Sequence, residues 1–229
     1  MNNLHLHQLI SGFGVKFHPK EMDLNLILEN YWGKFSTLFP NVKKEEFIKW
    51  INEDYFDGWE ETLNYNSTGR RELKMLYATI RASKPKKLLE IGTHMGTGTK
   101  HILLALSKNK EEGYECSVTT LDVEDFVGDT ILYDYPCRKI ISNSLEHLNN
   151  ENDYDFLVQD GSHEVTNVQK EVDMFYSMKN LKTLWAHDYY LGNGEVGKVF
   201  ENYDKKIFDI SSPFIEDSYI TGFFIGIKK

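Results

Sequence analysis

The stretch from Leu88 to Thr99 reads L-L-E-I-G-T-H-M-G-T-G-T and carries the clearest fold signal of the chain. A short apolar run predicts a strand over residues 87–91, and a helical pattern follows over residues 97–107. The glycines between them let the backbone turn tightly and approach a bound ligand closely. In parallel α/β sheets, ligands bind at the carboxyl ends of the strands. This stretch therefore predicts the ligand-binding edge of such a sheet.

The spacing of the glycines excludes two common phosphate-binding loops. A dinucleotide fingerprint needs G-x-G-x-x-G, and neither Gly92 nor Gly96 begins one. A P-loop ends in Gly-Lys-Ser or Gly-Lys-Thr, and neither sequence follows here. What remains is G-x-x-x-G-x-G with an acid, Glu90, two residues before its first glycine. At the end of a strand, this acid can accept a hydrogen bond or pair with an ammonium group.

Strand and helix patterns alternate along the rest of the chain. Strands are expected at residues 87–91, 117–121, 138–141, 155–159, 183–186, 206–210 and 220–227. Helices are expected at residues 97–107, from 144, at 165–178 and at 196–203, and residues 108–113 read as an exposed charged loop. Alternating βα units predict an α/β fold, namely a doubly wound, mostly parallel, seven-stranded Rossmann-like sheet.

The chain before Lys86 has a different character. Helical patterns occupy residues 23–35, 43–56 and 68–82, and no convincing strand precedes residue 86. We therefore expect a helical N-terminal extension or lid over residues 1–85 and a ligand-binding domain over 86–229. Six aromatic residues of the extension either pack it onto the main domain or line a substrate pocket: Trp32, Trp50, Tyr55, Phe56, Trp59 and Tyr65.

The composition and net charge of the chain limit the kinds of partner that it is expected to bind. The chain has 229 residues, 41% of them hydrophobic, and a formal net charge of −9. Such an acidic chain is not expected to bind nucleic acid or an anionic membrane, because nothing would neutralise phosphates over a wide face. No apolar run is long enough to span a bilayer, and residues 1–10 do not read as a secretory signal. Two cysteines, Cys116 and Cys137, suit a reduced, cytoplasmic protein.

Polar residues follow the second and third predicted strands. Asp122 comes directly after the second strand, where a carboxylate can accept hydrogen bonds from both hydroxyls of a ribose. An ordinary cap or loop acid is the alternative. After the third strand stand Ser142, Asn143 and Ser144, and either Asn143 or Ser144 could instead cap the next helix.

The fourth and fifth strands end in acids and imidazoles. Residues 154–163 read Y-D-F-L-V-Q-D-G-S-H, which contains Asp160 and His163, and His187 and Asp188 follow the fifth strand. Neighbouring parallel strands place their carboxyl ends side by side, so these four residues can converge. Two carboxylates suit a divalent cation such as Mg²⁺, which prefers oxygen ligands. The alternative is that Asp160 only contacts a cofactor or caps a turn, while His163 begins a helix.

The glycine loop, with the acid before it and the helix after it, resembles motif I of the class I S-adenosylmethionine-dependent methyltransferases. The resemblance implies an S-adenosylmethionine site in which Asp122 binds the ribose and Asn143, or else Ser142, meets the adenine. The residues that would contact the cofactor are Glu90, Gly92, Thr93, His94, Gly96, Gly98, Asp122, Val123, Asn143 and Asp160.

The D-G-S-H sequence makes the resemblance more specific. Over roughly residues 68–229, the chain resembles the metal-dependent O-methyltransferases related to macrocin O-methyltransferase, and also the cephalosporin-hydroxylase-like branch. That resemblance implies a metal, such as Mg²⁺, on Asp160 and Asp188, with His163 as the general base. This sequence departs from the family at His187, where an acid is usual, and His187 is then a second candidate base. The usual Pro-Gly-Gly turn before the fifth strand is also absent.

The implied reaction is O-methylation of a small-molecule hydroxyl, with a sugar as the family-based acceptor. A metal-independent N-methyltransferase, a hydroxylase-like relative and a catalytically silent cofactor-binding protein are the alternatives. A homodimer is one assembly that the sequence leaves open.

Overall fold

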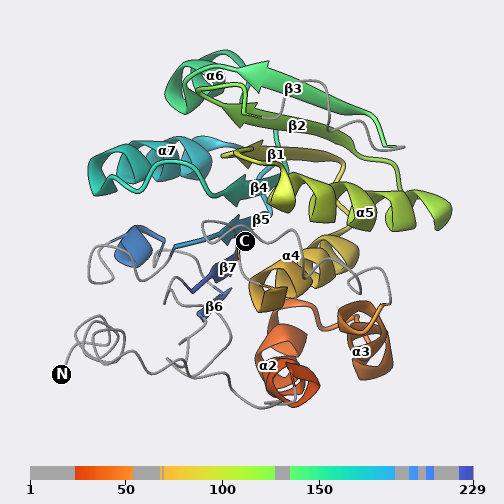
Figure 1. The fold of residues 1–229 in the computed structure, drawn as a ribbon. Coiled ribbons are helices and arrows are strands. Elements are labelled where there is room, and N and C mark those ends of the chain that lie inside the picture. Colours follow the sequence, from red (N-terminus) through yellow and green to blue (C-terminus); the bar gives the residue numbers. More distant parts are fainter. Residues whose placement is uncertain are drawn as a thin grey trace, which may run out of the picture.

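A seven-stranded sheet forms the centre of the computed structural model, which describes residues 24–53, 68, 70–126, 135–188, 196–200, 205–208 and 222–228 (Figure 1). The strands are β1 Lys87–Ile91, β2 Ser117–Asp122, β3 Cys137–Ile141, β4 Phe156–Gln159, β5 Thr183–Ala186, β6 Lys205–Phe208 and β7 Phe224–Ile227. Their order in the sheet is β3-β2-β1-β4-β5-β7-β6. The five strands from β3 to β5 pair in parallel, whereas β7 pairs antiparallel with both β5 and β6. This confirms the predicted doubly wound, mostly parallel sheet.

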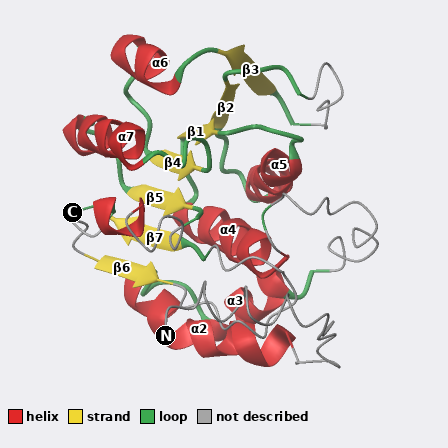
Figure 2. Ribbon diagram, turned by 60° about the vertical axis from the view of Figure 1, so that its left-hand side comes forward, coloured by secondary structure: helices red, strands yellow, loops and turns green. Residues whose placement is uncertain are grey.

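Helices cover both faces of the sheet, as two views turned by 60° agree (Figures 1 and 2). They are α2 Leu24–Leu38, α3 Lys44–Ile51, α4 Arg70–Ser83, α5 Thr97–Glu111, α6 Ser144–Asn150 and α7 Val165–Ser177. The helices α4 and α5 lie on one face, and α6 and α7 lie on the other. Side chains alternate along β1 accordingly, because Leu88 packs into the first cluster of core residues and Leu89 into the second.

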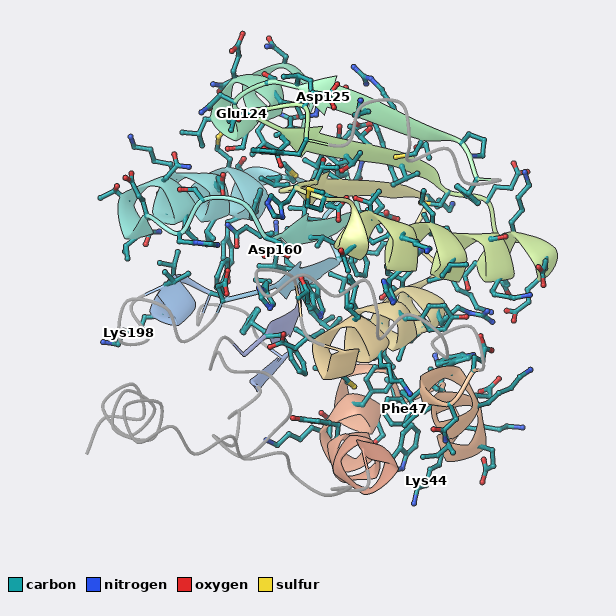
Figure 3. The ribbon with its side chains drawn as sticks, viewed as in Figure 1. Lys44, Phe47, Glu124, Asp125, Asp160 and Lys198 are labelled. Carbon is teal, nitrogen blue, oxygen red and sulfur yellow. The ribbon has the colours of Figure 1, made fainter. Side chains whose placement is uncertain are left out.

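The helices α2, α3 and α4 share a hydrophobic cluster with the sheet. Phe47 of α3 is fully buried, and its ring centroid lies 4.7 Å from that of Phe35 and 5.6 Å from that of Trp32, both in α2 (Figure 3). The same cluster contains Leu88 of β1 and Trp185 of β5. For Trp32 and Trp50 the structure shows packing against this core, while Tyr55, Phe56, Trp59 and Tyr65 lie outside the described residues.

Several predicted boundaries were wrong. The expected loop at residues 108–113 is the last part of α5, which continues to Glu111. Asn109 is buried there and donates to the backbone oxygen of Ile80 at 3.1 Å, so tertiary contact extends the helix through a charged stretch. Two other elements are shorter than predicted, because α3 ends at Ile51 and β7 begins only at Phe224. The ends predicted at residues 54–56, 201–203, 209–210 and 220 lie outside the described residues.

Both cysteines are free thiols, and burial raises the pKa of each to about 12. Within the described part of the chain, no helix has the length and apolar character needed to cross a membrane.

Candidate functional site

Backbone hydrogen bonds bring the residues that follow three parallel strands, β1, β4 and β5, to one edge of the sheet. The N–H of Gly92, after β1, donates to the oxygen of Leu121 at 2.8 Å. The N–H of Asp160, after β4, donates to Ile91 at 2.9 Å, and that of His187, after β5, donates to Gln159 at 2.9 Å. The candidate residues therefore converge because strand register places them side by side.

Two glycines of the loop adopt backbone conformations that other residues rarely take. Gly92 has a φ of +97°, and a Cβ built on it would lie 2.0 Å from the backbone oxygen of Asp160. Gly96 has a φ of 78° at the N-cap of α5, and its N–H donates to the oxygen of Thr93 at 2.8 Å. Any side chain at Gly92 would clash with the backbone of Asp160, and glycine at both positions favours the left-handed turns of the loop.

Glu90 lies beneath the loop and is 2% exposed. Its Oε2 accepts hydrogen bonds from the hydroxyls of Thr99 at 2.5 Å and Thr120 at 2.6 Å, and its Oε1 lies 2.9 Å from where a Cβ on Gly98 would stand. Burial raises the pKa of Glu90 to about 8, against the lowering effect of the two threonines. The two threonine hydroxyls fix this carboxyl group beneath the loop, and its contact with a cofactor stays a prediction.

Asp122 fixes the loop from the end of β2. Its Oδ2 accepts a hydrogen bond from the N–H of His94 at 2.7 Å, and its Oδ1 accepts one from Val123 at 2.7 Å. His94 has a φ of 41°, an uncommon value for a residue other than glycine. Exposed apolar side chains stand near this acid, since Val123 is 63% exposed and Phe126 lies edge-on to the His94 ring at 5.3 Å.

Asn143 has one of the two roles predicted for it, which are capping the helix α6 and contacting adenine. Its side-chain oxygen accepts hydrogen bonds from the N–H groups of Leu145 at 3.0 Å and Glu146 at 3.4 Å, so it caps α6. The residue is exposed at the end of β3, and a contact with adenine stays a prediction. Ser144 does not cap the helix, because its hydroxyl donates to the buried carboxylate of Glu171 at 2.5 Å.

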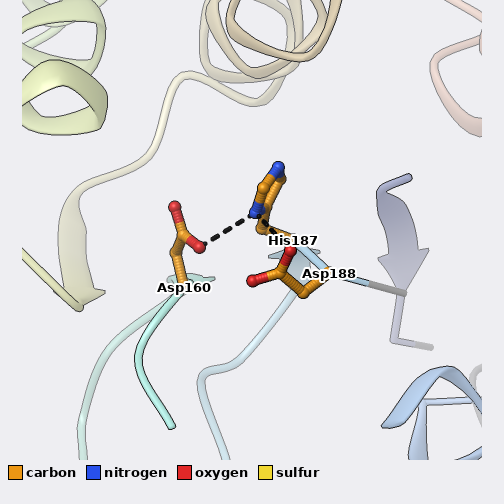
Figure 4. Close-up of side chains that lie close together, drawn as sticks. All are labelled: Asp160, His187 and Asp188. Atoms are coloured by element: carbon orange, nitrogen blue, oxygen red, sulfur yellow. Dashed lines mark ion pairs between the residues drawn. The ribbon is translucent and has the colours of Figure 1, made fainter. Parts of the chain in front are cut away.

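Three side chains converge after β4 and β5 (Figure 4). The Nδ1 of His187 lies 3.1 Å from Oδ1 of Asp160 and 3.1 Å from Oδ1 of Asp188. One donor atom from each of the three residues lies within 4.8 Å of the other two. Asp188 has a φ of +56°, a strained left-handed conformation of the kind that clusters at functional sites.

A second set of residues contacts the outer atoms of this cluster. The hydroxyl of Thr68 donates to Oδ2 of Asp160 at 3.0 Å, and Nε2 of His163 lies 2.6 Å from Oδ2 of Asp188. The Nε2 of His187 lies 2.8 Å from Oε2 of Glu72 in α4. Sequence reasoning missed Thr68 and Glu72. An acid in the first turn of a helix is common on dipole grounds, so Glu72 carried no distinct signal.

The carboxylates control the protonation of the two histidines. Burial lowers the pKa of His187, but the charges of Asp160 and Glu72 and the hydrogen bonds to Asp160 and Asp188 outweigh it and raise the pKa well above 6.5. The hydrogen bond to Asp188 likewise raises the pKa of His163. Burial would raise the pKa of Asp188, whereas hydrogen bonds to His163 and His187 lower it. Both ring nitrogens of the buried His187 face carboxylates, and its role as a second base stays a prediction.

The donor set of the cluster fits a divalent cation. Two carboxylate oxygens and one imidazole nitrogen face one another, and buried charges of this kind are usually paired or bound to metal. The imidazole is a departure from the all-oxygen set that Mg²⁺ prefers.

No protein-family profile matches the chain, and no curated protein matches it. Several solved structures, however, match the fold of this chain. An O-methyltransferase from Bacillus cereus in complex with SAH has a TM-score of 0.53 and 15% identity, over 98% of this chain and 97% of that one. The O-methyltransferase TomG from Streptomyces achromogenes, in complex with SAM, has a TM-score of 0.55 and 14% identity, over 91% and 100%. A methyltransferase from Geobacter sulfurreducens has a TM-score of 0.52 and 14% identity, over 96% of both chains. The chain therefore has the fold of the class I S-adenosylmethionine-dependent methyltransferases.

Proposed function

We propose that this protein is an S-adenosylmethionine-dependent methyltransferase that methylates a hydroxyl group of a small molecule. The observation that carries the proposal is the loop at Gly92–Gly98, held above the strand ends by Asp122 through the N–H of His94 at 2.7 Å. Glycines in left-handed conformations let this backbone approach a ligand. Asp122 ends β2, the position from which an acid accepts hydrogen bonds from a ribose in dinucleotide-binding sheets, and we assign it that role. The solved O-methyltransferases with SAH or SAM bound support the same assignment.

His163 is the proposed general base. Its side chain is 55% exposed and therefore open to an acceptor, while the Asp188 carboxylate that it contacts is 8% exposed. With Nε2–H donating to Oδ2 of Asp188, Nδ1 is the nitrogen left to take the proton. Asp188 thus fixes the tautomer and orientation of the base, the role that a carboxylate has in other acid–histidine pairs.

The reaction is an in-line displacement in which the acceptor oxygen forms a bond to the methyl carbon as the carbon–sulfur bond breaks. The hydroxyl proton goes to Nδ1 of His163, and the sulfonium leaves as a neutral thioether. The sulfonium methyl is already activated, so the protein mainly positions the two reactants and removes the proton. Asp160, Asp188 and His187 are the residues that would hold a cation. When bound, such a cation would lower the pKa of the acceptor hydroxyl.

Calorimetric titration with S-adenosylmethionine tests the proposal. We expect the wild-type protein to bind the cofactor and Asp122→Ala to bind it about ten- to a hundredfold more weakly, since hydrogen bonds to charged groups contribute about 1.5–3 kcal/mol. Glu124→Ala is the matched control, because it removes an exposed acid two residues away. Wild-type protein that does not bind the cofactor would contradict the assignment, and an unchanged affinity in Asp122→Ala would move the ribose contact elsewhere.

The acceptor class requires a second measurement. Transfer of a labelled methyl group is followed with matched panels of sugars, other small alcohols and amines. A labelled ether supports the O-methyltransferase. A labelled amine identifies an N-methyltransferase instead, and cofactor binding without transfer to any acceptor favours a silent cofactor-binding protein.

A further inference from the structure

Each of the three clustered residues has one donor atom facing the centre and a second atom held from outside. Asp160 directs Oδ1 to the centre, and Thr68 donates to its Oδ2 at 3.0 Å. Asp188 directs Oδ1 to the centre, and His163 contacts its Oδ2 at 2.6 Å. His187 follows the same rule, with Nδ1 at the centre and Nε2 at 2.8 Å from Glu72. All three outer partners together therefore orient the three inner atoms.

We propose that this cluster is a mononuclear transition-metal centre, ligated by Oδ1 of Asp160, Oδ1 of Asp188 and Nδ1 of His187, which binds Mn²⁺, Fe²⁺, Co²⁺ or Zn²⁺ in preference to Mg²⁺. Only its part in catalysis rests on the proposed function. The metal site itself rests on the geometry of the three residues and their outer partners.

The nitrogen ligand is the basis of the preference. Imidazole suits the later first-row metals, whereas Mg²⁺ favours oxygen donors and dehydrates reluctantly. A protein that used Mg²⁺ would gain from an acid at position 187, yet this chain carries His187 there, 7% exposed, with its side chain fixed at both ends. A nitrogen donor at the centre therefore shifts the selectivity of the site.

Glu72 is the positioning residue of the centre. Histidines that bind metals usually donate their other ring N–H to a carboxylate, which fixes the tautomer and raises the basicity of the ligand. The side chain of Glu72 is 4% exposed and reaches Nε2 of His187 from α4, so it meets this requirement. Loss of such a partner typically weakens metal binding about 10- to 100-fold.

Charge and access also suit a cation. Three carboxylates, from Glu72, Asp160 and Asp188, surround one imidazole in a site where two of them are almost fully buried. Asp160 is the most exposed member, with 22% of its side chain accessible. A metal could therefore reach the centre from the side of Asp160, where an acceptor oxygen or water would complete its coordination.

The test is a calorimetric titration of chelator-treated, full-length protein with Co²⁺, Zn²⁺, Mn²⁺ and Mg²⁺ in separate runs. We expect one transition-metal ion bound per chain, more tightly than Mg²⁺. Glu72→Gln should bind Co²⁺ about 10- to 100-fold more weakly. Its matched control is Glu171→Gln, which changes another buried carboxylate, in α7, without touching the cluster. His187→Asp supplies an oxygen donor and should reverse the preference toward Mg²⁺.

The outcomes separate this inference from the proposed function. Mg²⁺ binding as tightly as Co²⁺ in the wild-type protein would overturn the preference. No binding of any of the four ions would overturn the metal centre and leave His187 as a protonated group between the carboxylates. Titration of the same samples with S-adenosylmethionine shows whether the cofactor site is intact. A protein that binds the cofactor but no metal keeps the proposed function, and one that binds Co²⁺ but no cofactor keeps only the metal centre.

Discussion

Glu72 and His187 stand 115 residues apart in the sequence and form one buried pair, with Oε2 of Glu72 at 2.8 Å from Nε2 of His187. The pair joins α4, which precedes the sheet in the chain, to the carboxyl end of β5. Thr68, just before α4, makes a second such link to Asp160. The segment that the sequence presents as an extension therefore supplies two polar contacts to the candidate site.

The first prediction concerns the glycine loop. Gly96→Val and Gly113→Val both place a branched side chain at a positive φ, of 78° and 87° respectively, so both should lose stability. Gly113 has nothing within 4 Å of a built Cβ and lies at the far end of α5, whereas Gly96 stands in the candidate cofactor loop. Calorimetry with S-adenosylmethionine should show lost binding only for Gly96→Val. Equal affinities in the two variants would mean that the loop does not approach the cofactor.

The local pattern of apolar and polar residues was sufficient to predict much of the fold. The bounds of β1 and β5 were predicted correctly because each is a short apolar run that ends at a glycine or a charged pair. The convergence of Asp160, His163, His187 and Asp188 also followed from the rule for neighbouring parallel strands.

Contacts between segments that lie far apart in the sequence could not be predicted from local pattern. Glu72 reads as an ordinary first-turn acid, and only the packing of α4 against β5 brings it to His187. The extension of α5 depends on Asn109 reaching the backbone of Ile80, which no local pattern shows. Glu90 likewise faces two threonines rather than solvent because β2 supplies Thr120 beside it.

The second prediction concerns pH and stability. Burial raises the pKa of Glu90 in the folded protein from 4.5 to about 8, so between these values the folded state holds a proton that the unfolded state has released. Stability from this group is therefore present below the unfolded pKa and is lost as pH rises toward the folded pKa. Glu90→Gln should remove that loss, because the amide cannot ionise and its oxygen can still accept from Thr99 and Thr120.

Thermal unfolding at about pH 6 and about pH 9 measures this difference. The Tm of the wild-type protein should fall more than that of Glu90→Gln across this range. Glu124→Gln, which changes an exposed acid, should behave as the wild type. Parallel curves for the wild type and Glu90→Gln would show that Glu90 is ionised throughout.

The third prediction concerns the coupling of α2 and α3 to the sheet. Phe47 is fully buried in the cluster that also holds Leu88 of β1, so Phe47→Ala should lower the free energy of unfolding by about 3–5 kcal/mol. Lys49→Ala, on the exposed side of α3, should change it by no more than about 0.5 kcal/mol. Urea unfolding followed by circular dichroism should remain a single transition. A separate early transition in Phe47→Ala would show instead that the helical extension unfolds as its own domain.

The fourth prediction concerns the base. His163→Ala should bind S-adenosylmethionine as the wild type does, because the cofactor loop does not include this side chain. It should bind Co²⁺ more weakly, because His163 contacts Oδ2 of the proposed ligand Asp188. Its methyl-transfer rate should fall by about 10²–10⁴, the usual contribution of a general base. Added imidazole should restore part of the rate, since the side chain it replaces is 55% exposed and leaves a space open to solvent. Rescue by imidazole distinguishes a proton acceptor from a residue that only orients Asp188. A variant with full activity would place the base elsewhere, and a slow variant that imidazole does not rescue would leave His163 as a positioning residue for Asp188.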